Sequence, residues 1–457
     1  MSKRSPLGKQ ERTVRNRLAA HAGLLFIDFF EEPVAAIIKE IGLATRERIY
    51  TPLVTIAAFV CQALARGSCR KAVARVCAER LAAGKKPPSP NDDAYCEARG
   101  RLPLTLYTRV LYWLAERLEK RVSPHGPWLG RRVFVVDGSS FQTQDTPENR
   151  ACFGLPSGVK PGCGFPVVGF VAVFSLFTGA IHRLAFRSPK EGERRAYRRH
   201  WDLFKPGDVQ LTDRGFNSYG DLALASARGL DSVMRVLSRR LDFRKGKRLG
   251  PGDHLVTWLK PTRRPQGLTQ AEYDSLPEEM LVREIRYSLA AKGYRTKVVD
   301  LVTTLLDPVR FPREALADLY RRRWEAEINF RHIKSTMGTD MLSTKSPDMV
   351  YKEIATRMIA YNLLRELMWE AGARHGVDPL RISMKGTIDR LDELARILAE
   401  KNRALRRAHV DVILEQIARD IVPDRPGRSE PRAQKRRPKN YPFMKRPRNA
   451  PGARAVA

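Results

Sequence analysis

The sequence predicts a mixed α/β protein in which a β-rich core is flanked by helical regions. Three observations support this class. Apolar residues recur at helical spacing up to about residue 125, in stretches such as "YTPLVTIAAFVCQALARG". From residue 131, short apolar runs rich in valine and phenylalanine replace that pattern, as is typical of buried strands. After about residue 345 the helical spacing returns.

The composition indicates a folded protein with a polyanionic partner. Hydrophobic residues make up 43% of the chain, enough for a substantial core. Lys and Arg number 83 against 50 Asp and Glu, a formal charge of +33 with a pI near 10.4. Such a field speeds encounter with DNA or RNA, whereas no basic amphipathic membrane anchor is evident. No apolar run reaches the roughly 18 residues of a membrane span, so we expect a cytoplasmic, nucleoid-associated protein.

These changes of pattern divide the chain into successive regions. We expect a helical, DNA-binding region (1–125), the first part of the core (126–239), a β-rich insertion (240–310), the last core helix (311–345), a helical C-terminal region (346–424) and a basic tail (425–457). The tail is rich in proline and arginine, a composition that favours disorder until a polyanion is bound.

The cysteines give no sign of a metal site. There are six of them: Cys61, Cys69, Cys77, Cys96, Cys152 and Cys163. None forms a C-x2-C pair, and none has a histidine at zinc-ligand spacing. We therefore expect buried, reduced thiols.

Two acids follow apolar strands of the predicted core. "RRVFVVDG" predicts a strand that ends at Asp137, and "GDVQLTDRG" predicts one that ends at Asp213. Between them, "FPVVGFVAVFSLFTGAIHRLAF" predicts two strands joined at Thr178-Gly179, and a charged helix is expected over 190–204. With the helix and strand after Asp213, the order is β-β-β-α-β-α-β.

A basic helix supplies a third acid. The stretch "YRRRWEAEINFRHIK" begins at Tyr320, within a helix that we expect to open after Pro312. At about 100° per residue, Arg323, Glu327 and Lys334 all fall within about 60° of Tyr320, whereas Glu325 lies about 140° away. A solvated charged face and a nucleic-acid-binding helix are two interpretations; a catalytic helix, whose single acid lies among phosphate-binding groups, is the third.

Asp137, Asp213 and Glu327 together favour the catalytic interpretation. Three carboxylates in one place repel one another unless a cation holds them. Oxygen ligands suit Mg²⁺, and two such ions about 3.5–4 Å apart stabilise the attacking and leaving oxygens of phosphoryl transfer.

The sequence resembles the DDE transposases of bacterial insertion sequences, in particular the IS-four family. Tyr320, Arg323, Glu327 and Lys334 fit that family's Y-x2-R-x3-E-x6-K signature. "DGSSFQTQDTPEN" (137–149) is similar to its first-acid motif and "TDRGFNS" to its second. The three motifs occur in the family's order.

The resemblance implies an RNase H-like core whose catalytic acids are Asp137, Asp213 and Glu327. These residues would hold two Mg²⁺ ions, with Mn²⁺ as a substitute. Arg323, Lys334 and Tyr320 would bind DNA. The implied partners are the terminal inverted repeats of the element and the target DNA, bound by a dimer in a synaptic complex that performs cut-and-paste excision.

Four further side chains have two interpretations each. Arg214 could touch phosphate or form a structural salt bridge. Trp258 could stack on an unpaired base, as a tryptophan does in related enzymes, or belong to the core of the insertion. His332 lies away from the stripe and is expected at the surface or in packing, and Trp324 is expected to pack the helix onto the sheet.

Two other classes of function stay open. A metal-dependent nuclease or resolvase of the same fold would cut DNA and never join it. A non-catalytic, transposase-derived DNA-binding protein is disfavoured because all three acids are intact. Tyrosine recombinases use H-x-x-R, and none of the eight histidines has an arginine three residues later.

Overall fold

The computed structural model divides the chain into two compact units. It describes residues 23–43, 48–65, 67–82, 84–122, 128–156, 163–236, 241–288, 298–338, 341–397 and 403–423. The first unit, which we call the sheet unit, lies within residues 120–330; the second, the helical unit, combines residues up to 119 with 331–422. The N-terminal and C-terminal helical regions thus pack into one unit. The basic tail predicted from residue 425 lies outside the described residues.

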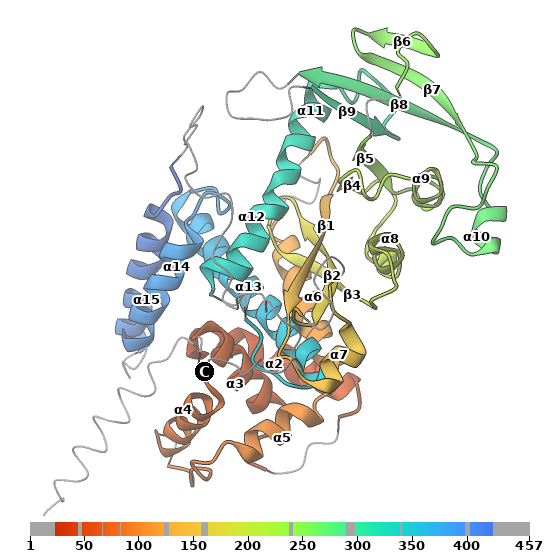
Figure 1. The fold of residues 1–457 in the computed structure, drawn as a ribbon. Coiled ribbons are helices and arrows are strands. Elements are labelled where there is room, and N and C mark those ends of the chain that lie inside the picture. The colour runs from red at the N-terminus through yellow and green to blue at the C-terminus, as the bar shows by residue number, and fades with distance from the viewer. Residues whose placement is uncertain are drawn as a thin grey trace, which may run out of the picture. The chain divides into compact units, whose positions relative to one another are not determined.

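The sheet unit is built on one mixed sheet, which confirms the α/β class (Figure 1). The strand order is β3-β2-β1-β4-β5-β9-β8-β7-β6. β1, β4 and β5 run parallel to one another, and the remaining pairs are antiparallel. The strands are β1 (Val133–Gln142), β2 (Val167–Ser175), β3 (Ile181–Arg187), β4 (Val209–Thr212), β5 (Asp231–Arg235), β6 (Lys247–Gly250), β7 (Asp253–Leu259), β8 (Glu279–Ser288) and β9 (Val298–Thr303).

The central strands form where apolar runs can be buried on both faces. Residues 133–136 of β1 and all four residues of β4 are buried, as is usual for parallel strands covered by helices. The predicted turn between β2 and β3 is confirmed. Gly179 there has a φ of 69°, a conformation that glycine adopts without steric cost.

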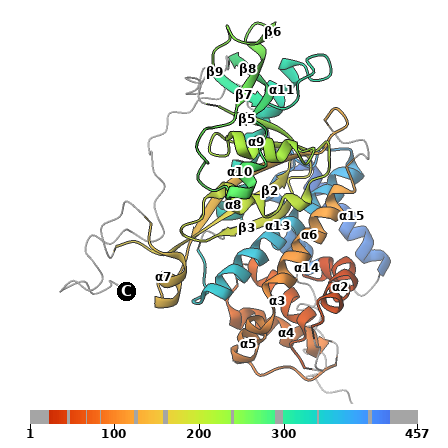
Figure 2. The ribbon, with the colours of Figure 1, turned by 90° about the vertical axis from the view of Figure 1, so that its right-hand side faces the viewer.

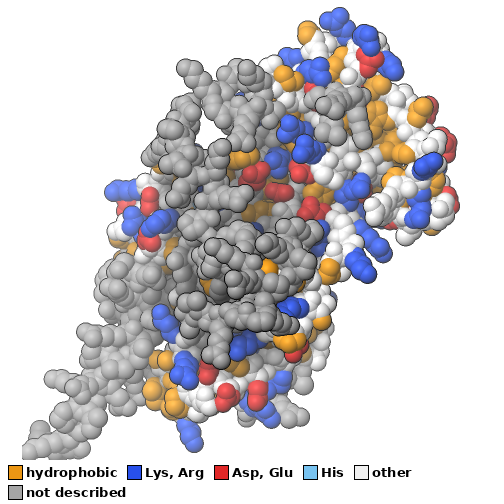
Figure 3. Space-filling view, viewed as in Figure 1, with side chains coloured by type: hydrophobic (Ala, Val, Ile, Leu, Met, Phe, Trp, Pro, Cys, Tyr) orange, Lys and Arg blue, Asp and Glu red, His pale blue; other side chains and the backbone are white. Residues whose placement is uncertain are grey.

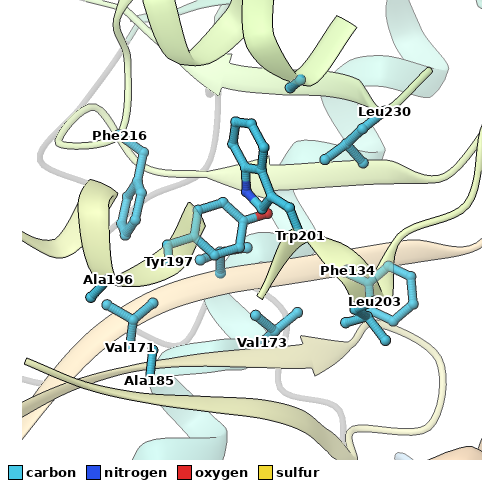
Figure 4. Close-up of a cluster of buried hydrophobic side chains, with 12 residues drawn as sticks. Phe134, Val171, Val173, Ala185, Ala196, Tyr197, Trp201, Leu203, Phe216 and Leu230 are labelled. Carbon is cyan, nitrogen blue, oxygen red and sulfur yellow. The ribbon is translucent and has the colours of Figure 1, made fainter. Parts of the chain in front are cut away.

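One face of the sheet is covered by an apolar core (Figure 4). Phe134 of β1 packs edge-to-face against Phe204, at 5.3 Å between ring centroids. Tyr197 and Trp201 pack on the same cluster from the segment after β3, with centroids 5.9 Å apart. The helix expected over 190–204 is therefore present in two shorter pieces: α8 (Glu193–Arg198) and a 3₁₀ turn, η1 (Trp201–Leu203).

The strands of the region predicted to be a β-rich insertion continue the same sheet. β9 pairs antiparallel with β5, with Val233 opposite Thr303, and β8, β7 and β6 follow outward (Figure 1). The other helices of the sheet unit are α7 (Pro147–Phe153), α9 (Tyr219–Ser226), α10 (Gln270–Asp274), α11 (Arg313–Arg321) and α12 (Glu325–Arg331).

The basic helix is interrupted. Between α11 and α12 lies a 3₁₀ turn, η3 (Arg322–Trp324), and after α12 comes a π-helical turn, η4 (His332–Thr336). The expectation of one continuous α-helix was wrong, because a uniform 100° per residue ignores these tighter and wider turns. Lys334, in η4, belongs to the helical unit.

The helical unit is organised around the long helix α13 (Pro347–His375), which packs against α6, α3 and α15 (Figure 2). Pro347 starts this helix and Gly376, with a φ of 65°, ends it. Its interior carries charge: Glu353 accepts hydrogen bonds from Ser343, Thr344 and Arg357. The other helices are α2 (Gly23–Glu40), α3 (Pro52–Leu64), α4 (Cys69–Ala82), α5 (Asp93–Arg101), α6 (Leu104–Glu119), α14 (Met384–Ile397) and α15 (Arg403–Arg419).

Among the described residues, no helix combines the length and the apolar character that crossing a bilayer requires.

Candidate active site

The first acid lies where the sheet opens. The sequence predicted a strand that ends at Asp137, but β1 continues to Gln142. The parallel partner β4 accompanies β1 only as far as Val135, opposite Leu211. Asp137 therefore lies where β1 has lost its neighbour on that side, and Asp213 emerges directly after the end of β4.

The third acid is carried by α12. Phe330 of that helix packs edge-to-face on Phe170 and Phe174 of β2, with centroids 5.9 and 5.1 Å apart. This contact holds α12 against the sheet beside β1. Glu327 is one turn earlier, with 42% of its side chain exposed. In Figure 3, acidic side chains gather over the region of β1, β4 and α12, with basic side chains beside them.

Arg323 connects two of the acids. Its Nη2 donates a hydrogen bond to Glu327 Oε1 at 3.1 Å, and its Nη1 is 4.0 Å from Asp137 Oδ2. Only 15% of the Arg323 side chain is exposed. Glu325, by contrast, pairs with Arg322 at 2.8 Å. The sequence placed Glu325 and Glu327 on different faces of the helix, and in the structure they pair with different arginines.

The three carboxylates influence one another electrostatically. The pKa of Asp137 is raised to about 6, first by burial and then by the charges of Asp213 and Glu327; Arg323 and the N–H of Gly138 act in the opposite direction. A carboxylate in this environment is stabilised by any cation that it can ligate.

The donor set fits divalent metal ions. Its members are carboxylate oxygens, the hard ligands that such ions prefer. Asp137 lies within β1, Asp213 follows β4, and Glu327 lies on α12, which is held against the sheet. The oxygens of the three acids do not all lie within 4.8 Å of one another, since among the described residues the one group of three ligand side chains within that distance lies in the helical unit. A pair of ions about 3.5–4 Å apart accommodates wider spacing.

Tyr320 makes an internal contact. Its hydroxyl donates a hydrogen bond to the carbonyl oxygen of Thr212 at 3.0 Å, and the side chain is buried. Burial raises the pKa of this phenol well above its ordinary value. Because the single hydroxyl proton goes to Thr212, the contact fixes the end of β4 immediately before Asp213. The neighbouring N–H of Gly215 donates to Asp213 Oδ1 at 2.8 Å.

The other predicted site residues differ in their surroundings. Arg214, next to Asp213, is exposed. Trp258 is half-buried; its indole N–H donates to Glu284 at 2.8 Å, and its ring packs beside Tyr219 and Leu268. Lys334 is half-buried in the helical unit.

The expectation that Trp324 packs the helix onto the sheet was wrong. This residue is 58% exposed. It ends the 3₁₀ turn η3, whose three residues per turn rotate the side chain away from the position that a continuous α-helix would give it. His332 is half-buried, consistent with packing.

Sequence reasoning missed an acid that lies against β1 at Gly138, on the face of the sheet opposite to the Asp137 side chain. A Cβ on Gly138 would come 2.5 Å from Glu193 Oε1, so the Glu193 carboxylate rests on the backbone of β1. Glycine at this position allows that approach. The one available signal was the glycine that follows Asp137, which does not indicate its partner.

Comparison with known proteins identifies the class and the family. A family model described as "Transposase DDE domain" matches residues 128–363. Transposase InsG for insertion sequence element IS4, from Escherichia coli strain K12, is 30% identical over 356 residues, which cover 76% of this chain and 77% of InsG. Putative transposase InsL for IS186A, from the same strain, is 24% identical over 190 residues, covering 35% and 51% of the two chains. Among solved structures, the piggyBac transposase synaptic complex with hairpin DNA aligns with a TM-score of 0.43 and 12% identity, covering 91% of this chain and 88% of that one.

The chain is therefore a DNA transposase, an enzyme of metal-dependent DNA cleavage and strand transfer. It belongs to the DDE transposases of insertion sequences, in the IS-four family.

Proposed function

We propose that Asp137, Asp213 and Glu327 are the catalytic acids and that they hold two Mg²⁺ ions, which Mn²⁺ can replace. The observation that carries this proposal is the approach of Arg323 to both Asp137 and Glu327. The pKa of Asp137, raised by burial and then by the charges of Asp213 and Glu327, supports it. When bound, the ions supply stabilisation of the attacking and leaving oxygens of an in-line displacement. The strand order β3-β2-β1-β4-β5, with β1, β4 and β5 parallel, supports an RNase H-like core for the sheet unit.

Two displacements would make up the reaction. In the first, water attacks a phosphodiester at the end of the element, so that the P–O3′ bond breaks and a free 3′-OH is released. In the second, that 3′-OH attacks a target phosphodiester, forming a new P–O bond and releasing the target's own 3′-OH. Both displacements are in-line attacks on phosphorus, so the same three acids can serve both.

The basic residues would hold the DNA during these displacements. Arg323 is next to two acids and has only 15% of its side chain exposed, so a phosphate that reaches it is largely desolvated. Lys334 and Arg214 would bind further phosphates. We further propose that the protein acts as a dimer in the nucleoid. The dimer would bind the inverted repeats of the element and excise it by a cut-and-paste route.

A strand-transfer assay separates this function from a nuclease. The protein is given a pre-cleaved element end with a free 3′-OH, supercoiled plasmid and Mg²⁺. We expect joined product from the unmodified chain and about 10- to 150-fold less from Lys334→Ala, because one charge-assisted phosphate contact contributes about 1.5–3 kcal/mol. Lys385→Ala is the matched control, since that exposed lysine pairs with Asp389. If intact ends are cut but pre-cleaved ends are never joined, the nuclease alternative is correct.

A further inference from the structure

Three side chains that could ligate a metal ion lie close together in the helical unit. No sequence motif indicates them. Cys69 is the first residue of α4, Asp92 directly precedes α5, and Cys96 is in the first turn of α5. The two sulfurs and one oxygen of the carboxylate all lie within 4.8 Å of one another. All three residues are partly exposed, so that an ion can reach them. The expectation that every cysteine is buried was wrong for four of the six, since Cys69, Cys77, Cys96 and Cys152 are only half-buried.

The Asp92 carboxylate is not used for the purpose that its position suggests. An aspartate at the N-cap usually accepts a hydrogen bond from the helix that it precedes. Here the side chain makes no capping hydrogen bond. Its nearest cation is Arg70, at 3.9 Å, on a side chain that is 83% exposed. Such a distant, solvated pair contributes little, and the carboxylate is left beside the two sulfurs.

A buried cation supports the sulfurs from the other side. Nη2 of Arg99 is 3.1 Å from Cys69 Sγ and 3.3 Å from Cys96 Sγ. The Arg99 residue is only 5% exposed, and its guanidinium lies over the rings of Phe59 and Tyr95 at 4.6 and 4.8 Å. A buried guanidinium needs negative charge nearby. Its hydrogen bonds here go to the two sulfurs, which become negatively charged thiolates when they ligate a cation.

The charges balance when a divalent cation is added. Two thiolates, one carboxylate and one guanidinium carry a net charge of minus two, which a divalent ion brings to zero. The N–H groups of Arg99 then donate to sulfurs that ligate the metal, an arrangement that orients such ligands and tunes their charge.

We propose that Cys69, Asp92 and Cys96 form a binding site for a thiophilic divalent cation of the Zn²⁺ type, with water as the fourth ligand. In a tetrahedral zinc site, metal–ligand distances of about 2.0–2.3 Å place neighbouring ligand atoms about 3.3–3.8 Å apart. Small rotations of partly exposed side chains reach that spacing from the present one. Two thiolates select Zn²⁺ over Mg²⁺, so this site is chemically distinct from the three acids of the sheet unit.

An ion bound there would cross-link two helices. It would fasten the first turn of α4 to the first turn of α5, which are joined by the body of α4 and a proline-containing connection. Binding would require deprotonation of both thiols and would release two protons per ion. It would stabilise the folded helical unit without contributing to the phosphoryl-transfer chemistry.

The absorption spectrum of bound Co²⁺ distinguishes this site from the three acids of the sheet unit. The full-length chain is reduced, freed of metal with a chelator and titrated with Co²⁺. We expect one equivalent to produce a sulfur-to-cobalt charge-transfer band and the visible bands of a tetrahedral ion, both of which Zn²⁺ then abolishes. Carboxylate-bound Co²⁺ gives no sulfur band. Cys69→Ser and Cys96→Ser should lose the band, and Asp92→Asn should weaken binding at least tenfold, the scale seen when a supporting group is removed.

Cys77→Ser is the matched control, because Cys77 is on the same helix but its thiol lies 3.7 Å from the carbonyl of Pro88. This variant should keep the band. If a serine variant does not fold, alkylation of the unmodified chain gives the same information: Zn²⁺ should slow the reaction of iodoacetamide with Cys69 and Cys96 and leave Cys77 unchanged. The proposal is overturned if the reduced chain gives no sulfur band, or if Zn²⁺ protects neither thiol. A Cys69–Cys96 disulfide that forms in place of metal binding would also overturn it.

Discussion

The guanidinium of Arg323 donates a hydrogen bond to the Glu327 carboxylate at 3.1 Å, four residues further along the chain. Its other terminal nitrogen is 4.0 Å from Asp137. One arginine therefore partly neutralises two of the three acids, and in the proposed function the same arginine binds a phosphate. Removing it should separate two effects: the acids lose their internal cation, and DNA loses a contact.

Arg323→Gln should lower the thermal stability of the metal-free chain and reduce strand transfer. It should also increase the stabilisation produced by Mg²⁺, because the ions then meet less positive charge and replace the missing cation. Arg321→Gln is the control, since Arg321 is more than half exposed and pairs with Asp318. Melting curves with and without Mg²⁺ measure the effect. Equal Mg²⁺ increments in the unmodified chain and Arg323→Gln would contradict the assignment of Arg323.

Asp137→Asn should stabilise the metal-free chain while abolishing cleavage. The pKa of Asp137 rises from 3.8 to about 6 on folding, mainly through burial. Because the folded state binds this proton more tightly than the unfolded state does, stability is lost as pH rises from about 4 to about 6, and the loss is complete above pH 6. Each pKa unit corresponds to about 1.4 kcal/mol, so we expect a gain of about 1–3 kcal/mol at pH 7.

The test of this prediction is the difference between the two chains across pH, measured by chemical denaturation. Asp137→Asn should match the unmodified chain near pH 4 and exceed it from pH 6 upward. A difference that is constant across this range would mean that the asparagine acts through packing and not through the carboxylate charge.

The core strands were predictable because their signals are local. Val133 to Val136 form an apolar run between charged residues, and burial on both faces requires nothing else of a central parallel strand. The pairing of β9 with β5 was not predictable, since the apolar pattern of a strand does not specify its neighbour. The continuation of the core sheet through the insertion is therefore a finding of the structure.

For the candidate active site, the sequence predicts residues but not the contacts that those residues make. Glu325 and Glu327 were separated by helical periodicity alone, and their arginine partners differ accordingly. Tyr320 was assigned to DNA, although its hydroxyl bonds to the backbone of β4. No spacing rule links a helix residue to a carbonyl 108 positions earlier. The same reason hides Cys69, Asp92 and Cys96, which come together only when α4 packs against α5.

Tyr320→Phe should slow cleavage while leaving the affinity for the element end within about twofold. The lost hydrogen bond leaves the Thr212 carbonyl without its donor, a cost of about 1–3 kcal/mol, and loosens the residue that precedes Asp213. Tyr273→Phe removes a comparable bond, to the carbonyl of Pro261 in the insertion, and should not affect cleavage. Gel-shift titration and single-turnover cleavage separate the two effects. A large loss of affinity in Tyr320→Phe would support the DNA-binding role implied by the family resemblance.

Glu327→Gln and Glu325→Gln form a matched pair, two residues apart and equal in charge change. The first should reduce Mg²⁺-dependent cleavage by about 10³-fold or more, since metal-ion stabilisation of the transition state is worth several kcal/mol. The second should be mild, because the pair with Arg322 that it removes is half-exposed. Cleavage rates at saturating DNA measure both. If Glu325→Gln is the inactive variant, the assignment of Glu327 fails.

Substitutions of Trp258 can distinguish a packing role from a base-stacking role. Its indole N–H donates to Glu284, which also contacts His254 at 2.8 Å, and the ring is half-buried against the core of the insertion. Trp258→Phe keeps an aromatic ring and loses one hydrogen bond, so we expect about 1 kcal/mol of destabilisation and near-normal cleavage. Trp258→Ala should destabilise the chain by about 3 kcal/mol. The measurement that decides is the fluorescence of a base analogue placed beside the cut. If Trp258→Phe folds normally and yet changes that signal and the excision products, the ring stacks on DNA and the packing role is secondary.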